Sequence, residues 1–256
     1  MPFATIIYPA APIRRKPDHR KEMVNQLLFG ESVEVLREKG SLWLKVRSLH
    51  DNYEGWITRS LVHFVEPPLA QVRPALVTSD LLTPVQIRER IMHIPFGSSL
   101  PFFENGKGMI GDIEFSGQLI AWDRNKQEDR LAAVLQLGEK WMQAPYCWGG
   151  RTILGVDCSG FVQILMKMVG IDLPRDAWQQ AQEGEVIEKF KEAIPGDLVF
   201  FDNKEDIVHV GILIGNDRLI HSSGQVRIDR IDKRSVIHAG SGKRMQQLKA
   251  IRRILP

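Results

Sequence analysis

Polar and apolar residues alternate over short stretches in the first quarter of the chain. The clearest stretches are residues 31–36 and 42–46, and residues 53–57 continue the pattern. Alternation with a period of two is typical of strands that bury one face. Residues 1–66 therefore predict about five short strands, which is enough for a small β-barrel.

A second β-rich stretch is expected between residues 75 and 122, after the two prolines at 67 and 68. Residues 84–92 fit either a strand or a helical turn. Residues 96–103 and 111–117 fit strands bounded by turns. This pattern predicts a second small barrel, more divergent than the first.

The second half of the chain begins with helical periodicity and ends with strands. Residues 127–143 carry apolar side chains at three- and four-residue steps, and residues 160–170 form a mostly apolar run that a glycine closes. A shorter helix is expected over residues 175–183. Strands are expected over residues 197–201, 208–214, 218–222 and 250–254. Helices followed by strands predict an α+β fold.

Cys158 is the first candidate for chemistry, because it comes just before the apolar helix at residues 160–170. The first turn of a helix offers unpaired N–H groups and the positive end of the helix dipole, and both favour the nucleophilic thiolate. A catalytic cysteine also needs a base, usually histidine, which a third group orients. A buried structural thiol is the alternative, and the local sequence leaves both open.

His209 and His221 lie in the predicted strands and are the candidate base and orienting group. An even-length hairpin loop across residues 215–218 would place them on opposite faces of the sheet. A bulge, an odd-length loop or an irregular strand start is therefore required if both are to face Cys158.

Composition excludes several classes of function. The chain has 256 residues, 43% hydrophobic and 25% charged, with a net charge of +3, which does not indicate nucleic acid or a membrane surface as a partner. The apolar residues at the N-terminus precede the basic ones, the reverse of a secretory signal, so we expect a cytoplasmic protein. No Cys and His spacing fits zinc, and no phosphate loop is present, so neither metal nor organic cofactor is implied. Oligomeric state stays open.

Six segments resemble the NlpC/P60 family of cell-wall cysteine peptidases when taken together and in order. They are residues 145–150, 157–162, 173–175, 195–201, 209–212 and 220–223. The resemblance covers roughly residues 130–256 and implies a papain-like core. Residues 29–36, 43–46 and 55–57 are similar to a bacterial SH3 domain. The expected domains are an SH3-like barrel at 1–66, a probable second one at 67–125, and the peptidase at 126–256.

The resemblance implies roles for the matching residues. Cys158 would be the nucleophile, His209 the base and His221 the residue that orients the base, while the hydroxyl of Tyr146 would lie near the sulfur. Residues that flank the nucleophile bind substrate in the family, which implies that role for Asp157 and Ser159. Further substrate-binding candidates are Tyr53, Glu54, Trp148 and Ser222.

The implied reaction is cleavage of peptidoglycan-derived peptides between γ-D-glutamate and a diamino acid such as meso-diaminopimelate. Family members with SH3 modules tend to prefer a free L-alanine amine, and Glu54 could pair with that amine while Tyr53 contacts it. Two alternatives stay open at this point. One is an acyltransferase built on the same papain-like core, and the other is a non-catalytic module that binds the cell wall.

Overall fold

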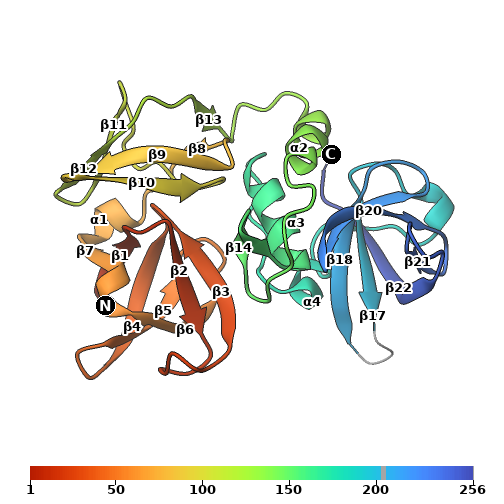
Figure 1. Cartoon of the computed structure of the whole chain (residues 1–256), viewed down its shortest axis with the longest axis horizontal. Coiled ribbons are helices and arrows are strands. Elements are labelled where there is room, and N and C mark those ends of the chain that lie inside the picture. The colour runs from red at the N-terminus through yellow and green to blue at the C-terminus, as the bar shows by residue number, and fades with distance from the viewer. Residues whose placement is uncertain (203–205, 256) are drawn as a thin grey trace. The chain divides into compact units, whose positions relative to one another are not determined.

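The structure is a computed structural model that describes residues 1–202 and 206–255. The chain divides into two compact units (Figure 1). The N-terminal unit comprises residues 1–126 and 148–153, and the C-terminal unit comprises residues 127–147 and 154–256. The observed division after Lys126 falls one residue from the predicted start of the peptidase domain, but residues 148–153 group with the N-terminal unit.

The first part of the N-terminal unit is a small closed β-barrel with strand order β3-β2-β6-β5-β4-β1-β7. Its strands are β1 (Phe3–Ile6), β2 (Ala10–Arg14), β3 (Met23–Leu28), β4 (Ser32–Lys39), β5 (Trp43–Ser48), β6 (Glu54–Thr58) and β7 (Val62–Val65), with a 3-10 turn, η1, at Arg59–Leu61. Val33 and Val35 on β4 alternate with partly exposed residues and share the barrel core with Leu44 and Val46 of β5. The predicted alternation is therefore confirmed.

The second part of the N-terminal unit follows a short helix, α1 (Pro67–Ala70). Its strands are β8 (Leu76–Thr78), β9 (Leu82–Ile87), β10 (Arg90–Pro95), β11 (Lys107–Ile110), β12 (Ile113–Ser116) and β13 (Ala121–Asp123). They form a four-stranded sheet, β10-β9-β12-β11, and a separate β13-β8 pair. Residues 84–92 thus belong to a hairpin. Membership of the SH3 class stays a prediction for this part.

The strand predicted over residues 96–103 is wrong. Only Ser99 forms a β-bridge there, to Val77. The reason is local, because Gly97 and Phe102 have φ values of 75° and 52°, in the left-handed region that strands exclude. Residues 96–103 are instead a loop that is buried up to Pro101, with the Phe96 and Leu100 side chains almost fully covered and Phe102 exposed.

Residues 148–153 belong to the N-terminal unit because a buried ion pair fixes them there. The guanidinium of Arg151 donates to both carboxylate oxygens of Glu31, at 2.9 and 3.0 Å, and both side chains are at most 2% exposed. The backbone N–H of Arg151 also donates to the side chain of Gln26. Gly149 passes so close to β3 that an added Cβ would lie 2.7 Å from the carbonyl oxygen of Met23. The short strand β14 (Arg151–Thr152) follows.

The described residues of the C-terminal unit form three helices and one seven-stranded sheet, and α3 and α4 pack against that sheet. The helices are α2 (Arg130–Glu139), α3 (Cys158–Lys167) and α4 (Ala177–Gln180). The strands of the sheet are β16 (Glu185–Val186), β17 (Leu198–Asp202), β18 (Ile207–Leu213), β19 (Arg218–Ser223), β20 (Gln225–Ile231), β21 (Ser235–Ile237) and β22 (Arg244–Arg253), with β15 (Gly155–Val156) before α3 and a 3-10 turn, η2, at Phe190–Glu192. Their order is β16-β22-β17-β18-β19-β20-β21, and β21 also pairs with β22.

Helix α3 is the centre of this unit, and all ten of its residues are buried. It packs against β18 and β19, while α2 approaches through Gly138, where an added Cβ would lie 3.4 Å from Leu165 of α3. Trp141, just after α2, meets Phe161 edge-on with ring centroids 6.0 Å apart. These contacts confirm the predicted α+β arrangement of helices and strands.

Three strands of the sheet, β16, β20 and β21, were not predicted from the sequence. β20 carries Arg227, Asp229 and Arg230 among its seven residues, and this charge obscures the short alternation of Val226 and Ile228. β16 and β21 are only two and three residues long. β20 matters for the site, because it is the neighbour of the strand that carries His221.

Candidate active site

Cys158 is the first residue of α3 and lies against the strand that carries His209. Its sulfur lies 3.9 Å from the carbonyl oxygen of Val208, and the backbone amide of Val210 also reaches it. Val208 and Val210 flank His209 in the chain, so the sulfur lies beside the backbone on either side of this histidine. As the first residue of α3, Cys158 has a backbone N–H without an acceptor within the helix.

Burial has the largest effect on the ionisation of Cys158. It raises the pKa of the thiol to about 12, and the carboxylate of Asp157 adds to this increase. Hydrogen bonds from the amides of Val210 and Ser159, together with the charge of Arg175, act in the opposite direction. The helix N-terminus was expected to favour thiolate, but burial outweighs it, so the resting residue is a neutral thiol.

His209 and His221 are in direct contact inside the sheet. The Nε2 atom of His209 lies 2.7 Å from Nδ1 of His221, and the two side chains are 4% and 0% exposed. Burial lowers the pKa of both imidazoles, that of His209 well below its usual 6.5. Both rings are therefore neutral at neutral pH, and a neutral imidazole can accept a proton.

The register of β18 and β19 brings the two histidines to the same face without a bulge between these strands. Leu213 pairs with Leu219 and Ile212 with Ile220, so five residues connect the paired ends. An odd-length connection is one of the three features, with a bulge and an irregular strand start, that could bring both histidines to the face of Cys158. Gly211 contributes as well, because a Cβ atom there would lie 2.9 Å from Cβ of His221.

Asp229 on β20 joins this pair, and the sequence did not single it out. Its Oδ2 atom lies 3.0 Å from Nε2 of His221 and accepts from Nε of Arg227 at 2.9 Å. Its Oδ1 atom accepts from the backbone N–H of Ala239 at 2.8 Å. A signal was present, since Asp229 lies two residues from Arg227, which pairs with His221 across the strands, but β20 itself had to be recognised first.

Tyr146 lies beside the segment that leads into α3. It bridges to Val156 in parallel, and its N–H donates to the carbonyl oxygen of Gly224. Burial and the negative charge of Asp157 raise the pKa of its hydroxyl, so the hydroxyl stays protonated and can donate a hydrogen bond. The position of the Tyr146 hydroxyl near the nucleophile stays a prediction.

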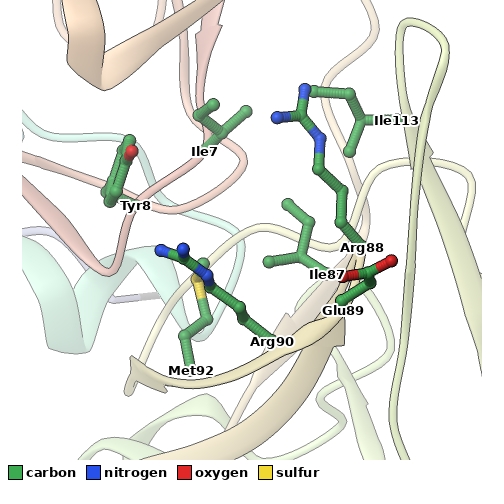
Figure 2. A pocket seen from close by; sticks show the side chains of 8 residues that line it. All are labelled: Ile7, Tyr8, Ile87, Arg88, Glu89, Arg90, Met92 and Ile113. Carbon is green, nitrogen blue, oxygen red and sulfur yellow. The ribbon is translucent and has the colours of Figure 1, made fainter.

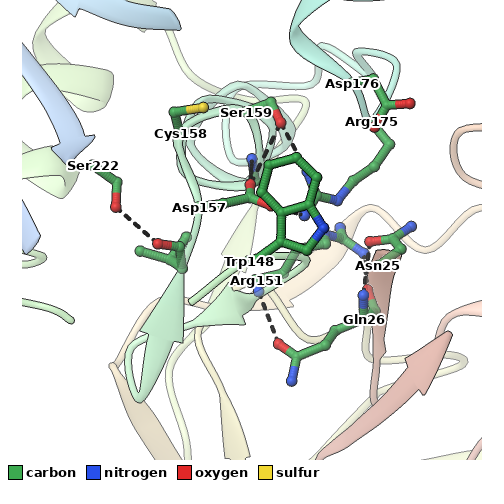
Figure 3. A network of polar contacts seen from close by, with 12 residues as sticks. Asn25, Gln26, Trp148, Arg151, Asp157, Cys158, Ser159, Arg175, Asp176 and Ser222 are labelled. Atoms are coloured by element: carbon green, nitrogen blue, oxygen red, sulfur yellow. Dashed lines mark hydrogen bonds and ion pairs between the residues drawn. The ribbon is translucent and has the colours of Figure 1, made fainter. Parts of the chain in front are cut away.

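Asp157 and Ser159, on either side of Cys158, are tied together by a buried arginine (Figure 3). Arg175 donates through Nη2 to the carboxylate of Asp157 at 2.5 Å and through Nη1 to the hydroxyl of Ser159 at 2.8 Å. Asp157 also caps α3 by accepting from the N–H of Gly160 at 2.7 Å. Arg175 was not predicted to be a site residue, although residues 173–175 are one of the six segments that resemble the family.

Comparisons with known proteins identify the family of the chain. The sequence profile of the NlpC/P60 family matches residues 143–245, and that of the bacterial dipeptidyl-peptidase Sh3 domain matches residues 13–61. The chain is 30% identical over 212 residues to the gamma-D-glutamyl-L-lysine dipeptidyl-peptidase of Bacillus subtilis, with 77% of this chain and 71% of that protein covered. The chain belongs to the NlpC/P60 family. Its relatives are named dipeptidyl-peptidases or endopeptidases, so the predicted class of enzyme, a cysteine peptidase, is confirmed.

Two further comparisons cover nearly the whole chain. Dipeptidyl-peptidase 6 of Lysinibacillus sphaericus is 26% identical over 262 residues, with 92% of this chain and 94% of that protein covered. A crystal structure of an NlpC/P60 family protein from Bacillus cereus has a TM-score of 0.83 at 21% identity and covers 99% of this chain. This second similarity shows that the fold is shared.

The remaining candidates of the NlpC/P60 site differ in their surroundings. Ser222 is fully buried, and its hydroxyl donates to the carbonyl oxygen of Val156 at 2.8 Å (Figure 3), so a substrate-binding role gains no support from its position. Tyr53, Glu54 and Trp148 all belong to the N-terminal unit. The carboxylate of Glu54 pairs with two cations, Lys45 at 2.8 Å and Arg47 at 2.7 Å, and a substrate amine would have to compete with them.

A pocket of about 480 Å³ in the N-terminal unit is unrelated to the thiol chemistry (Figure 2). Ile7 and Tyr8 of the barrel line one side, and residues 87–90, Met92 and Ile113 line the other. These described lining residues include neither cysteine nor histidine. Within residues 1–202 and 206–255, no three His, Cys, Asp or Glu side chains are grouped as metal ligands.

None of the helices in the described part of the chain has the length and apolar character needed to span a membrane. The cytoplasmic location expected from the sequence stays a prediction.

Proposed function

We propose that this NlpC/P60 peptidase hydrolyses the bond between γ-D-glutamate and a diamino acid in peptides derived from peptidoglycan. The observation that carries the proposal is the arrangement of three side chains: the Cys158 sulfur beside the backbone that flanks His209, and His209 bonded to His221 at 2.7 Å. Acyl transfer by a thiol requires a nucleophile beside a base, and a third group that orients the base.

The hydrogen bond to His221 uses the Nε2 atom of His209, so Nδ1 is the ring nitrogen left to accept the thiol proton. Because burial favours the neutral thiol, the proton passes to His209 as the sulfur attacks the γ-carbonyl carbon. The imidazolium then protonates the leaving amine of the diamino acid, and the acyl group stays on sulfur. Water, deprotonated by His209, adds to the thioester and releases the γ-glutamyl product and the thiol.

The negative oxygen that forms during attack needs hydrogen-bond donors. The backbone N–H of Cys158 at the start of α3 is one candidate donor, since it has no acceptor within the helix. The hydroxyl of Tyr146 is the second candidate, because its raised pKa keeps the proton in place. We propose that both lie close to the reacting carbonyl when substrate is bound.

We further propose that the enzyme prefers a free L-alanine amine ahead of γ-D-glutamate. The support comes from the relatives, whose names include dipeptidyl-peptidase, and from the matching Sh3 domain. The diamino acid is proposed to be meso-diaminopimelate, with L-lysine, printed in the name of the Bacillus subtilis relative, as the comparison substrate.

The test is mass spectrometry of L-Ala-γ-D-Glu-meso-diaminopimelate after incubation with the protein. The proposal predicts the dipeptide L-Ala-γ-D-Glu and free diaminopimelate, with no products from Cys158→Ala. Acetylating the L-alanine amine should reduce kcat/KM by at least about 10²-fold, because a charged group left without its partner is costly. Intact peptide after long incubation, or equal cleavage by Cys158→Ala, would refute the proposed reaction.

A further inference from the structure

Asp229 is the last member of a buried chain of hydrogen bonds that begins at His209. The chain runs from His209 Nε2 to His221 Nδ1 at 2.7 Å, and from His221 Nε2 to Asp229 Oδ2 at 3.0 Å. The side chains of His221 and Asp229 are at most 1% exposed. The sheet register explains the contact, because Arg227 pairs with His221 and Asp229 lies two residues further along the same face of β20.

The carboxylate of Asp229 is ionised in spite of its burial. Burial alone would raise its pKa, but hydrogen bonds from His221, from the N–H of Ala239 and from Arg227 lower the pKa below its usual value. Arg227 is itself held in place, since its Nη1 atom donates to the carbonyl oxygen of Ser223 at 2.6 Å. An ionised carboxylate can only accept hydrogen bonds, so His221 must carry its proton on Nε2.

The proton on Nε2 of His221 also determines the tautomer of His209, through the hydrogen bond between the two rings. Burial keeps His221 neutral, so a proton on Nε2 leaves Nδ1 as an acceptor. The hydrogen bond between the rings then requires His209 to donate from its own Nε2 atom. His209 is neutral as well, and its Nδ1 atom is therefore left without a proton. Without Asp229, two neutral histidines could share the same hydrogen bond in the reverse sense, with Nδ1 of His209 protonated and unable to act as base.

We propose that Asp229, with Arg227 as its counter-ion, is a positioning residue that sets the tautomers of both His221 and His209. Asp229 influences the reaction indirectly, through its hydrogen bond to His221 and the bond from His221 to His209. The inference rests on the proposed function in one respect, namely that His209 is the base. It adds a residue on β20 to the proposed active site and assigns a protonation state to the Nδ1 and Nε2 atoms of both His209 and His221.

Nitrogen-15 NMR of histidine side chains tests the assignment directly, since protonated and bare ring nitrogens have well-separated shifts. The signals of His209 and His221 are identified by comparison with His209→Ala and His221→Ala. In the wild-type protein at neutral pH, both should be Nε2–H tautomers. In Asp229→Ala, a substantial population of Nδ1–H tautomers should appear at both positions, and kcat/KM should fall by about 10²-fold.

Asp232→Ala is the matched control. Asp232 also pairs with an arginine, Arg244, and accepts from two backbone amides, but its described contacts include no imidazole. Its loss should leave both tautomers unchanged and kcat/KM within about threefold of wild type. If Asp229→Ala does not fold, Asp229→Asn replaces it. The amide keeps one oxygen for His221 but is a weaker acceptor, so about a 10-fold loss is expected.

A purely structural role for Asp229 would lower stability without changing tautomers in the folded protein. The inference is overturned if wild-type His221 is an Nδ1–H tautomer. It is equally overturned if the folded Asp229 variant matches Asp232→Ala in tautomers and kcat/KM. These outcomes are separate from failure of the proposed function, in which Cys158→Ala would retain activity or the wild-type protein would cleave no γ-D-glutamyl peptide.

Discussion

Gly211 leaves the space that the side chain of His221 occupies on the neighbouring strand. A Cβ atom on Gly211 would lie 2.9 Å from Cβ of His221, closer than side-chain carbons approach one another. His209 is two residues before Gly211 on β18, on the same face. The glycine therefore allows the two imidazoles to meet at 2.7 Å within a tightly packed pair of strands.

Gly211→Ala should displace the imidazole of His221 and reduce kcat by about 10²-fold, with a smaller change in KM. The effect is steric, because the φ angle of Gly211 is not in the left-handed region. Gly215→Ala is the control, since a Cβ atom at that position would meet only Cβ of Arg218 at 3.9 Å. Steady-state kinetics of the two variants test this prediction. Equal kcat values would show that His221 can be displaced without loss of activity.

His209→Ala should cost more activity than His221→Ala. Removing His209 takes away the group that accepts the thiol proton, and we expect a loss of at least about 10³-fold in kcat/KM. Removing His221 leaves the base present but badly oriented, so the loss should be about 10-fold smaller. Rates with L-Ala-γ-D-Glu-meso-diaminopimelate measure both. Equal losses would leave the two roles unassigned, and a larger loss for His221→Ala would reverse them.

The Cys158 thiol should stay protonated at neutral pH in the absence of substrate. Its pKa is raised to about 12 by burial, so the thiolate forms only well above the usual 9.0. The ultraviolet absorbance of thiolate, taken as the difference between wild type and Cys158→Ala, should be flat from about pH 6 to about pH 9. A full thiolate signal at neutral pH would mean that a thiolate and imidazolium pair exists before substrate binds.

Loss of the buried Glu31–Arg151 ion pair should destabilise the N-terminal unit. Glu31→Ala leaves the guanidinium of Arg151 buried without its carboxylate, which is expected to reduce the free energy of unfolding by about 3–5 kcal/mol. Glu38→Ala removes an exposed pair with Arg59 and should cost less than about 1 kcal/mol. Denaturant unfolding compares them. Similar small losses would mean that the buried pair does not fix residues 148–153.

The sequence was sufficient to propose Cys158 as nucleophile and His209 as base, and to predict the α+β class and most strands of the first barrel. The apolar helix after Cys158 made the residue a candidate, and the six segments that resemble the NlpC/P60 family made it the proposed nucleophile. The barrel strands were predictable because their alternation has a strict period. The contact between His209 and His221 could not be derived, because it depends on an odd-length connection that local patterns do not specify.

Asp229 and Arg175 show what sequence reasoning misses. Asp229 lies on β20, where charged residues mask the alternation, and its partner His221 is eight positions away on another strand. Arg175 follows a proline in a loop, and only the folded chain brings it to Asp157 and Ser159. Buried polar networks of this kind arise from tertiary packing, and the propensity of single residues carries no information about them.

Detection of the acyl-enzyme tests the central claim most directly. The protein is mixed with L-Ala-γ-D-Glu-meso-diaminopimelate, quenched in acid within the first turnover, digested and analysed by mass spectrometry. The account predicts an L-Ala-γ-D-Glu group on the peptide that contains Cys158, and none on the peptide that contains Cys147. Hydrolysis that proceeds without any adduct on Cys158, and at an unchanged rate in Cys158→Ala, would contradict it.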